Sequence, residues 1–357
     1  MSIIDKYDRP IRDLRISVTD KCNFRCTYCM PAEIYGESYQ FLPKEKILTF
    51  EEITRLTKIF TELGVRRIRI TGGEPLLRKD LPILINQLSS IKKLSDISLT
   101  TNGYLLDRSV KELVQSGLKR VTVSLDTLDQ KTFNQMSGRN LKISKILSGI
   151  ESASDAGLNP IKINCVVKKN INENSILDLI DHFKNTNHIV RFIEYMDVGN
   201  LNKWDLSEVV SSKEILEIIK RKYSVKPLSE SFKGEVANRY AFVSKNEINK
   251  GEIGIISSVT NPFCSNCTRS RLTTDGKLVT CLFSNSGLDL KKELRTGKND
   301  TYLKSLIKNY WEKRTDRYSE LRSKNNSSKN KKIEMYQLGG LISVIKRIIN
   351  KFWKSSQ

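Results

Sequence analysis

The sequence predicts an α/β protein, a partial (β/α)6 barrel of parallel strands followed by a smaller C-terminal α+β region. Two observations predict the barrel. Strand and helix signals alternate from residue 11 to residue 193, and the strand signals are short runs rich in Ile, Val and Leu, as in buried parallel sheets. A third observation predicts the second region, because the pattern changes to short alternating runs after about residue 220. A chain of 357 residues is long enough for both parts.

The first predicted strand covers residues 11–18, and a cysteine-rich loop follows its carboxyl end. Further helices are expected at 50–63, 80–90, 107–116, 141–156 and 174–185, and further strands at 65–70, 94–99, 119–124, 161–167 and 188–193. Because strand–helix–strand crossovers are right-handed, these six strands should form one parallel sheet that curls into a partial barrel. Active sites of α/β barrels lie at the carboxyl ends of the strands.

The C-terminal third divides by composition. Runs at 239–243 and 252–257 predict strands of the smaller region. We therefore expect a barrel domain at 1–220, the second region at 221–321, a polar linker with a Gly-Gly tail at 322–340, and a basic amphipathic extension at 341–357. A helix docked on the protein's own surface, a contact with an anionic membrane and a partner contact all fit the extension.

Charge and composition bound the function. The formal net charge of +21 predicts attraction to polyanions, which include nucleic acid, anionic lipid and phosphorylated small molecules. No apolar run is long enough for a transmembrane segment, and the polar start lacks a signal peptide, so a cytoplasmic protein is expected. The seven cysteines form two groups with Cys165 left over, which fits a reducing compartment, and Cys165 is expected to be a buried strand residue.

The first cysteine group, Cys22, Cys26 and Cys29, has Cys-x3-Cys-x2-Cys spacing. A 4Fe-4S cluster that is fully ligated by protein needs four ligands, so three thiolates leave one iron open to a small molecule. The alternative is a structural zinc site. A zinc site would need a fourth ligand nearby, and the histidines, His182 and His188, are remote in sequence.

The second group consists of Cys264, Cys267 and Cys281, with the basic segment Arg269-Ser270-Arg271 inside it. It again offers three thiols without a nearby fourth ligand. We expect a second 4Fe-4S cluster whose open iron is offered to a substrate, while a zinc clip with an unrecognised ligand stays the alternative. The two arginines lie two residues apart on a predicted strand and should therefore face one ligand.

Ligand-binding residue types follow or lie within several strands. The paired glycines of Thr71-Gly72-Gly73-Glu74-Pro75 allow a close backbone approach, and the carboxylate can meet an ammonium group. The segments 100–103 and 124–126 offer groups that suit ribose and adenine edges, or could simply cap helices. Arginines are unusual in short parallel strands, and a buried polyphosphate would explain them. These basic residues are Arg15, Arg67, Arg69, Lys162 and Arg191.

The first cysteine triad, with Tyr28 before its last cysteine, resembles the radical S-adenosylmethionine enzymes. Three further segments make the resemblance more specific: Gly-Gly-Glu-Pro-Leu-Leu-Arg, Arg-Phe-Ile-Glu-Tyr-Met-Asp-Val-Gly at 191–199, and Cys-x2-Cys-Thr-Arg-Ser-Arg-Leu. Together they resemble the GTP 3′,8-cyclase family of molybdenum cofactor biosynthesis, from about residue 9 to Gly340.

The resemblance implies two 4Fe-4S clusters, one on each triad, and a reaction in which a 5′-deoxyadenosyl radical takes hydrogen from ribose carbon 3′ of GTP before that carbon attacks guanine carbon 8. It assigns S-adenosylmethionine to Tyr28, Gly73, Ser124 and Met196. It assigns GTP to Arg15, Arg69, Thr100, Lys162, Arg269, Ser270 and Arg271, with Arg67 and Arg191 as further phosphate contacts.

The implied partners are a one-electron donor of flavodoxin or ferredoxin type, cyclic pyranopterin monophosphate synthase as the next enzyme, and a second copy of the chain in a homodimer. In this family the chain usually ends at a double glycine, whereas here Gly339-Gly340 is followed by residues 341–357. Two other interpretations of the sequence remain. The protein could be a radical enzyme that modifies RNA or a peptide, or a non-enzymatic basic metal-binding module that binds nucleic acid. The chain has no recognisable RNA-binding motif, so we expect no nucleic-acid partner.

Overall fold

The structure, a computed structural model, describes residues 2–200, 203–232, 234–244, 247–322 and 332–337. In this part of the chain the strands form one sheet in the order β12-β11-β10-β1-β2-β3-β4-β5-β6-β9-β8-β7. The strands are β1 (Asp13–Ser17), β2 (Arg67–Thr71), β3 (Asp96–Thr101), β4 (Arg120–Ser124), β5 (Lys162–Val167), β6 (Ile189–Glu194), β7 (Val225–Leu228), β8 (Asn238–Ser244), β9 (Glu247–Ile256), β10 (Arg269–Leu272), β11 (Lys277–Val279) and β12 (Leu288–Asp289).

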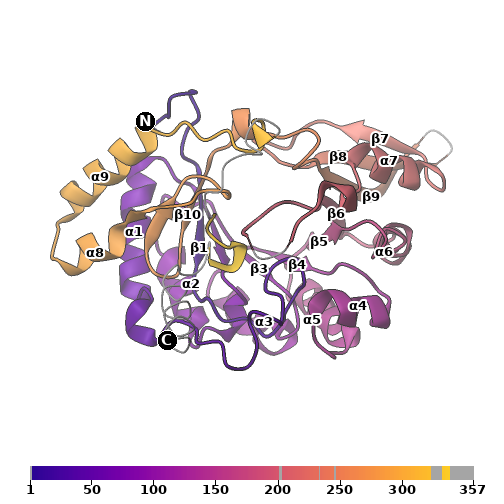
Figure 1. The fold of residues 1–357 in the computed structure, drawn as a ribbon, viewed down its shortest axis with the longest axis horizontal. Coiled ribbons are helices and arrows are strands. Elements are labelled where there is room, and N and C mark those ends of the chain that lie inside the picture. Colours follow the sequence, from indigo (N-terminus) through magenta and orange to yellow (C-terminus); the bar gives the residue numbers. More distant parts are fainter. Residues whose placement is uncertain (1, 201–202, 233, 245–246, 323–331, 338–357) are drawn as a thin grey trace, which may run out of the picture.

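Helices connect the strands of the barrel and cover its outside (Figure 1). Local signals start several of them. Thr49 and Glu52 form a capping box at the first helix, and Ser211 and Glu214 form one at the seventh. The helices are α1 (Phe50–Leu63), α2 (Leu81–Ser89), α3 (Leu106–Gln115), α4 (Gln130–Ser137), α5 (Ile143–Asp155), α6 (Ser175–Phe183), α7 (Ser212–Lys220), α8 (Leu290–Arg295) and α9 (Asp300–Glu312).

The predicted parallel barrel strands are confirmed, with β1 to β6 adjacent in chain order and the sheet left open. The C-terminal region extends the same sheet at both edges. Strand β10 pairs with β1 in parallel, and β9 pairs with β6 in parallel. Figure 1 shows the result: α8 and α9 lie beside α1 at one side of the molecule, while β7, β8 and β9 continue from β6 at the other.

The two faces of the barrel strands have different compositions. Leu14 and Ile16 of β1 and Ile70 of β2 are fully buried in the core between the sheet and the helices. The alternate residues, such as Arg15 and Arg69, therefore face the inside of the barrel. A core on the outer face leaves the inner face free for polar side chains, and this explains why arginines occur in these strands.

Two parts of the sequence-based expectation lie outside the described residues. These are most of the linker, with Gly339-Gly340, and the extension at 341–357. Among the residues that are described, none of the helices has both the length and the apolar character that crossing a membrane requires.

Candidate functional site

The first cysteine group lies in the loop after β1, at the rim formed by the carboxyl ends of the parallel strands, here called the C-terminal rim. All three of its thiols are free and partly buried. The Arg25 guanidinium braces the loop, because Nη1 donates to the carbonyl oxygens of Cys22 at 2.7 Å and Phe24 at 2.8 Å, and Nε donates to that of Tyr35. The loop backbone is therefore held by the protein's own contacts.

Burial strongly disfavours the charged form of these thiols. It raises the pKa of Cys22 to about 12, with a further contribution from the charge of Glu74, and it raises the pKa values of Cys26 and Cys29 well above the ordinary value. Such thiols become thiolates when a bound metal supplies positive charge. In the described residues no three Cys, His, Asp or Glu side chains converge on one ion position. A 4Fe-4S cluster does not require this, since each thiolate binds a different iron, so three soft, buried donors on one loop fit that group.

Tyr28 connects the cysteine loop to the ends of β4 and β5. Its hydroxyl donates to Asp126 Oδ2 at 2.7 Å, and Asp126 Oδ1 accepts from the Val166 backbone N–H at 2.8 Å. The sequence suggested that Asp126 could bind a ribose or adenine edge, but in the structure its carboxylate holds Tyr28. Burial raises the pKa of Asp126 to about 6. Ser124, the last residue of β4, lies two residues before Asp126 at the same rim.

Gly73 lies directly against the cysteine loop. Its N–H donates to Thr19 O at 2.8 Å, and a Cβ at this position would lie 2.4 Å from Lys21 O. The carboxylate of the neighbouring Glu74 is buried and stabilises this turn. It accepts from Leu76 N at 3.0 Å, Thr101 Oγ1 at 2.7 Å and Asn102 N at 2.8 Å, and its contact with an ammonium group stays a prediction.

The carboxyl ends of the strands bring the predicted S-adenosylmethionine contacts to one rim. Met196 follows β6, as Gly73 follows β2 and the loop of Tyr28 follows β1, and Ser124 ends β4. Because these strands are parallel, the four positions lie at the same rim of the barrel as the first cysteine group.

The second cysteine group lies at the opposite, N-terminal rim. Cys264 and Cys267 precede β10, which is parallel to β1, and Cys281 follows β11, which is antiparallel to β10. Arg314 holds this group, because Nη1 donates to Cys267 O at 2.8 Å and Nη2 lies 3.2 Å from Cys267 Sγ. The cysteine groups therefore lie at opposite ends of the barrel interior.

Nearby positive charges lower the pKa of one thiol of the second group, that of Cys267. Burial alone would raise the pKa of Cys267, but the guanidinium groups of Arg269, Arg314 and Arg271 outweigh it and lower this pKa to about 5. The positive charge around Cys267 therefore favours its thiolate form. Burial raises the pKa of Cys281 to about 11, with a contribution from Asp316. A thiolate and further buried thiols fit an iron–sulfur ligand set.

Cations line the barrel between the cysteine groups. Arg15 lies in register with Arg69 on one side and Arg271 on the other, and Thr100 and Lys162 both pair with Thr122. Burial lowers the pKa of Lys162 to about 8, that of Arg191 to about 9 and that of Arg271 to about 10, with the charges of neighbouring arginines contributing in each case. Three buried side-chain atoms in this lining have no hydrogen-bond partner in the described residues: Thr100 Oγ1, Arg269 Nε and Arg271 Nη1.

Three predicted nucleotide contacts already have intramolecular partners. Arg67 forms a bidentate pair with Asp13 at 2.7 and 3.0 Å, and Arg191 donates to Asn164 Oδ1 at 2.7 Å. The Ser270 side chain is on the outer face of β10 and donates to Asp13 O at 3.0 Å, so any nucleotide contact at this position falls to its backbone. These residues differ from Arg15 and Arg69, for which the described residues provide no hydrogen bond or ion pair.

Sequence reasoning missed Arg120, the first residue of β4. It faces the interior two residues before Thr122, and it forms a bidentate pair with Asp96. The signal was present, because Arg120, Thr122 and Ser124 share one face of a predicted strand.

A short C-terminal segment at residues 332–337, here called the strap, crosses from the second cysteine group to the first. Ile333 N donates to Ser284 O at 2.8 Å, near Cys281. At its other end the Tyr336 hydroxyl lies 3.0 Å from that of Tyr39, and its ring packs against Tyr35 in the first cysteine loop. No local pattern in residues 332–337 predicts this placement.

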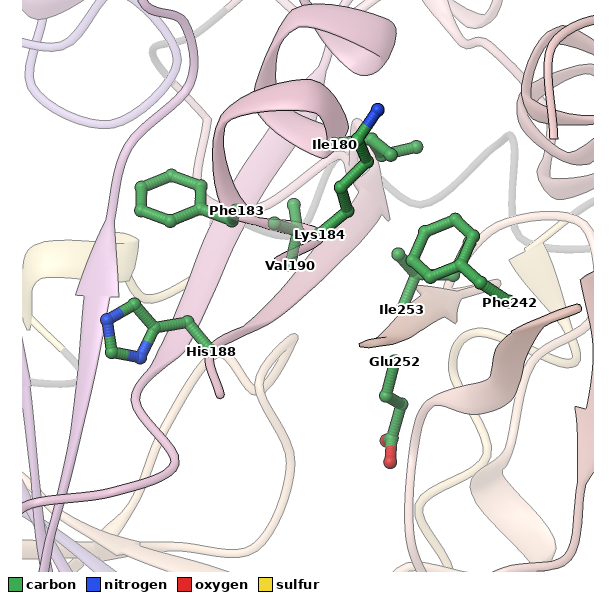
Figure 2. Close-up of a pocket in the computed structure, with 8 residues that line it drawn as sticks. All are labelled: Ile180, Phe183, Lys184, His188, Val190, Phe242, Glu252 and Ile253. Carbon is green, nitrogen blue, oxygen red and sulfur yellow. The ribbon is translucent and has the colours of Figure 1, made fainter. Parts of the chain in front are cut away.

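A small hollow lies away from both cysteine groups (Figure 2). It has no enclosed space for a water molecule and is lined by side chains from α6, β6, β8 and β9. His188 precedes β6, and Glu252 of β9 pairs in register with Ile189. Figure 2 shows Phe183 and His188 on one side of the hollow and Phe242 and Glu252 on the other. The hollow contains none of the predicted site residues.

Comparisons with known proteins agree with this geometry. Residues 16–183 match the Radical SAM superfamily, and residues 188–320 match Molybdenum Cofactor Synthesis C. The solved structure of SuiB from Streptococcus suis bound to S-adenosylmethionine is similar in fold, with a TM-score of 0.60 and 16% identity over 93% of this chain and 73% of that chain. SuiB bound to the precursor peptide SuiA gives a TM-score of 0.58 and 17% identity over 86% of this chain and 66% of that chain.

Fold and cysteine loop together define a member of the radical S-adenosylmethionine superfamily. The sequence relatives narrow this further. GTP 3′,8-cyclase of Staphylococcus epidermidis is 48% identical over 95% of this chain and 99% of the relative. GTP 3′,8-cyclases of Staphylococcus saprophyticus and Staphylococcus aureus, at 47% and 46%, cover the same shares. The chain belongs to the GTP 3′,8-cyclase family.

Proposed function

We propose that the chain converts GTP to (8S)-3′,8-cyclo-7,8-dihydroguanosine 5′-triphosphate, the first step of molybdenum cofactor biosynthesis. Family membership supports the reaction, and the cation-lined interior between two cysteine groups carries the assignment in this chain. Four arginines have no ion-pair partner in the described residues and match the charge of a triphosphate: Arg271, which is buried, and Arg15, Arg69 and Arg269, which are partly buried.

Each rim has a separate part in this proposal. Cys22, Cys26 and Cys29 hold a 4Fe-4S cluster at the C-terminal rim, where Tyr28, Gly73, Ser124 and Met196 bind S-adenosylmethionine. When bound, the reduced cluster supplies the electron that cleaves the sulfonium and generates the 5′-deoxyadenosyl radical. Cys264, Cys267 and Cys281 hold a second 4Fe-4S cluster at the N-terminal rim, which receives the guanine.

The chain's own residues contribute placement. The arginines, Lys162 and Thr100 fix the triphosphate and ribose inside the barrel, so that the guanine points to one rim and carbon 3′ to the other. Fixing both reactants in one geometry converts the hydrogen transfer into an intramolecular step.

The proposal includes the partners that such a reaction needs. These are a flavodoxin- or ferredoxin-type electron donor, cyclic pyranopterin monophosphate synthase as the enzyme that receives the product, and a homodimer in the cytoplasm.

The deciding assay is cleavage of S-adenosylmethionine by the reconstituted, reduced protein without oxygen. We expect 5′-deoxyadenosine formation that depends on GTP, together with a cyclised product that retains all three phosphates. ATP serves as the control, because it has the same triphosphate but a different base. Cleavage that responds equally to ATP, or that responds to RNA or a peptide instead, would contradict the proposed substrate.

A further inference from the structure

Arg120 lies between two residues of the cation lining. On β3, Ser98 pairs with Arg69 of β2 on one side and with Arg120 of β4 on the other. Two residues further along β4, Thr122 pairs with Lys162 of β5. All of these positions belong to the inner face of the sheet, so Arg120 occupies the space between Arg69 and Lys162.

Asp96 binds one edge of the Arg120 guanidinium, and the other edge can donate hydrogen bonds to a ligand. Nε donates to Asp96 Oδ1 at 2.7 Å and Nη2 to Asp96 Oδ2 at 2.5 Å, while Nη1 has no hydrogen-bond partner in the described residues. The side chain keeps 35% of its surface exposed. A guanidinium held by one carboxylate in this way can still donate to a second anion.

The charge of Arg120 acts on both Arg69 and Lys162. After burial, the charge of Arg120 is the next cause that lowers the pKa of Arg69. It also lowers the pKa of Lys162, after burial and the charge of Arg191. The hydrogen bonds from Asp96 raise the pKa of Arg120, which therefore stays charged and can donate from Nη1 to an anion.

The loop between β7 and β8 brings a carboxylate to the same cations. The loop is seated on the N-terminal rim, because the Phe232 ring lies 4.2 Å from the Arg67 guanidinium and Gly234 approaches Asn266 of the second cysteine group. Glu235 follows in this loop, with its Oε2 accepting from Ser231 N at 2.8 Å. Its negative charge favours the charged forms of Arg120, Lys162 and Arg191.

Building on the function proposed above, we propose that Arg120 is a further triphosphate-binding residue and that Glu235 is a carboxylate that the triphosphate displaces from these cations. Nη1 of Arg120 binds a phosphate oxygen while Asp96 keeps the guanidinium in place. Because a carboxylate and a polyphosphate repel each other, Glu235 moves away when the nucleotide binds. Together the two residues favour nucleotides with three phosphates over those with fewer.

Equilibrium dissociation constants for GTP, GDP, GMP and inorganic triphosphate test the role of Arg120. Arg120→Gln removes one charge-assisted hydrogen bond. It should raise the dissociation constants of GTP and inorganic triphosphate about tenfold or more, and that of GMP about twofold or less. Arg120→Lys should recover part of the difference. Arg55→Gln is the control, since that guanidinium pairs with Asp300 on the surface.

A purely structural role gives a different pattern. If Arg120 only satisfies Asp96, then Arg120→Gln and Asp96→Asn should lower the melting temperature alike, and the ratio of GMP to GTP dissociation constants should stay at the wild-type value in both. That ratio, unchanged in Arg120→Gln and Arg120→Lys, would overturn the assignment.

Glu235→Gln removes the competing charge. It should lower the dissociation constants of GTP and inorganic triphosphate about threefold to tenfold. Glu230→Gln in the same loop should leave both constants unchanged. Unchanged or weaker binding by Glu235→Gln would overturn its displacement. Failure of the proposed function looks different: the wild-type protein would then bind ATP as tightly as GTP, while the response of the variants to phosphate number could still be measured.

Discussion

Arg15 and Arg69 lie in register on adjacent parallel strands and face the same interior, and the described residues offer neither of them a carboxylate partner. Burial lowers the pKa of both, and for Arg15 the charges of Arg271 and Arg69 lower it further. An arrangement of this kind costs folding free energy unless an anion binds. It is the clearest sign in the structure of a polyanionic ligand.

Arg69→Gln should therefore have opposite effects on stability and on binding. Removing a partly buried cation that has no ion-pair partner should raise the free energy of unfolding of the ligand-free protein by about 1 kcal/mol. The same change should weaken GTP binding about tenfold or more, because a charge-assisted contact is lost. Thermal unfolding with and without GTP measures both. If Arg69→Gln destabilises the ligand-free protein, the residue has a structural role that the geometry does not reveal.

The lowered pKa of Lys162 predicts how the binding of inorganic triphosphate depends on pH. Burial lowers its pKa to about 8 in the folded protein, against 10.5 for an ordinary lysine. The folded protein thus loses this proton first, so the cost of the buried charge is fully present below about pH 8 and fades as the pH rises toward 10.5. Affinity for inorganic triphosphate should fall as the pH rises above about 8, because the neutral amine no longer attracts phosphate.

The matched variant for that measurement is Lys162→Arg, because a guanidinium keeps its proton to higher pH than an amine in the same surroundings. It should bind inorganic triphosphate with less loss between pH 7.5 and 9.5, which are about the limits of a convenient titration. Equal pH profiles for the two proteins would mean that Lys162 does not titrate in contact with the ligand.

Gly73→Ala should disturb the cysteine loop. The new Cβ would lie 2.4 Å from Lys21 O and 2.9 Å from Asp20 O, which are backbone atoms that can move only with the loop. We expect a loss of about 1–3 kcal/mol in the free energy of unfolding and weaker binding of S-adenosylmethionine. Gly36→Ala is the control, because its Cβ would meet only Ala32 O at 3.4 Å. Wild-type binding by Gly73→Ala would show that this close approach does not position the cofactor.

Asp197 holds both the strap and the segment that precedes the linker. Its carboxylate accepts from Arg322 Nε at 2.9 Å, the Tyr318 hydroxyl at 2.6 Å and Lys332 Nζ at 2.8 Å. Asp197→Asn should release residues 332–337, because it leaves two cations without their shared anion. Hydrogen exchange of the strap should become faster, while exchange in α1 stays the same. Unchanged exchange in the strap would mean that Tyr336 and Ile333 suffice to hold it.

Much of the barrel could be predicted because its signals are local. The apolar runs of β1 to β6 and the apolar periodicity of the predicted helices between them are each visible within about ten residues, and the predicted bounds agree with the observed ones to within a few residues. The inward direction of Arg15 and Arg69 also follows from the alternation of a strand. Cys165 is a buried strand residue, as predicted.

What the sequence did not reveal depends on long-range pairing. The attachment of β10 to β1 joins residues more than two hundred positions apart, and no local pattern shows that the C-terminal region extends the same sheet at both edges. For the same reason the contacts of Glu74 with Thr101, of Tyr28 with Asp126 and of the strap with Tyr39 were not predicted. Helix α4 was missed because it is short and weakly apolar.

The central proposal is that each of the two cysteine groups binds its own 4Fe-4S cluster. Iron content after anaerobic reconstitution tests this most directly, in the wild-type chain and in the triple Cys→Ser variants of each group. We predict about eight irons per wild-type chain and about four in either variant. About four irons in the wild-type chain, or tightly bound zinc in place of iron at either group, would contradict the account.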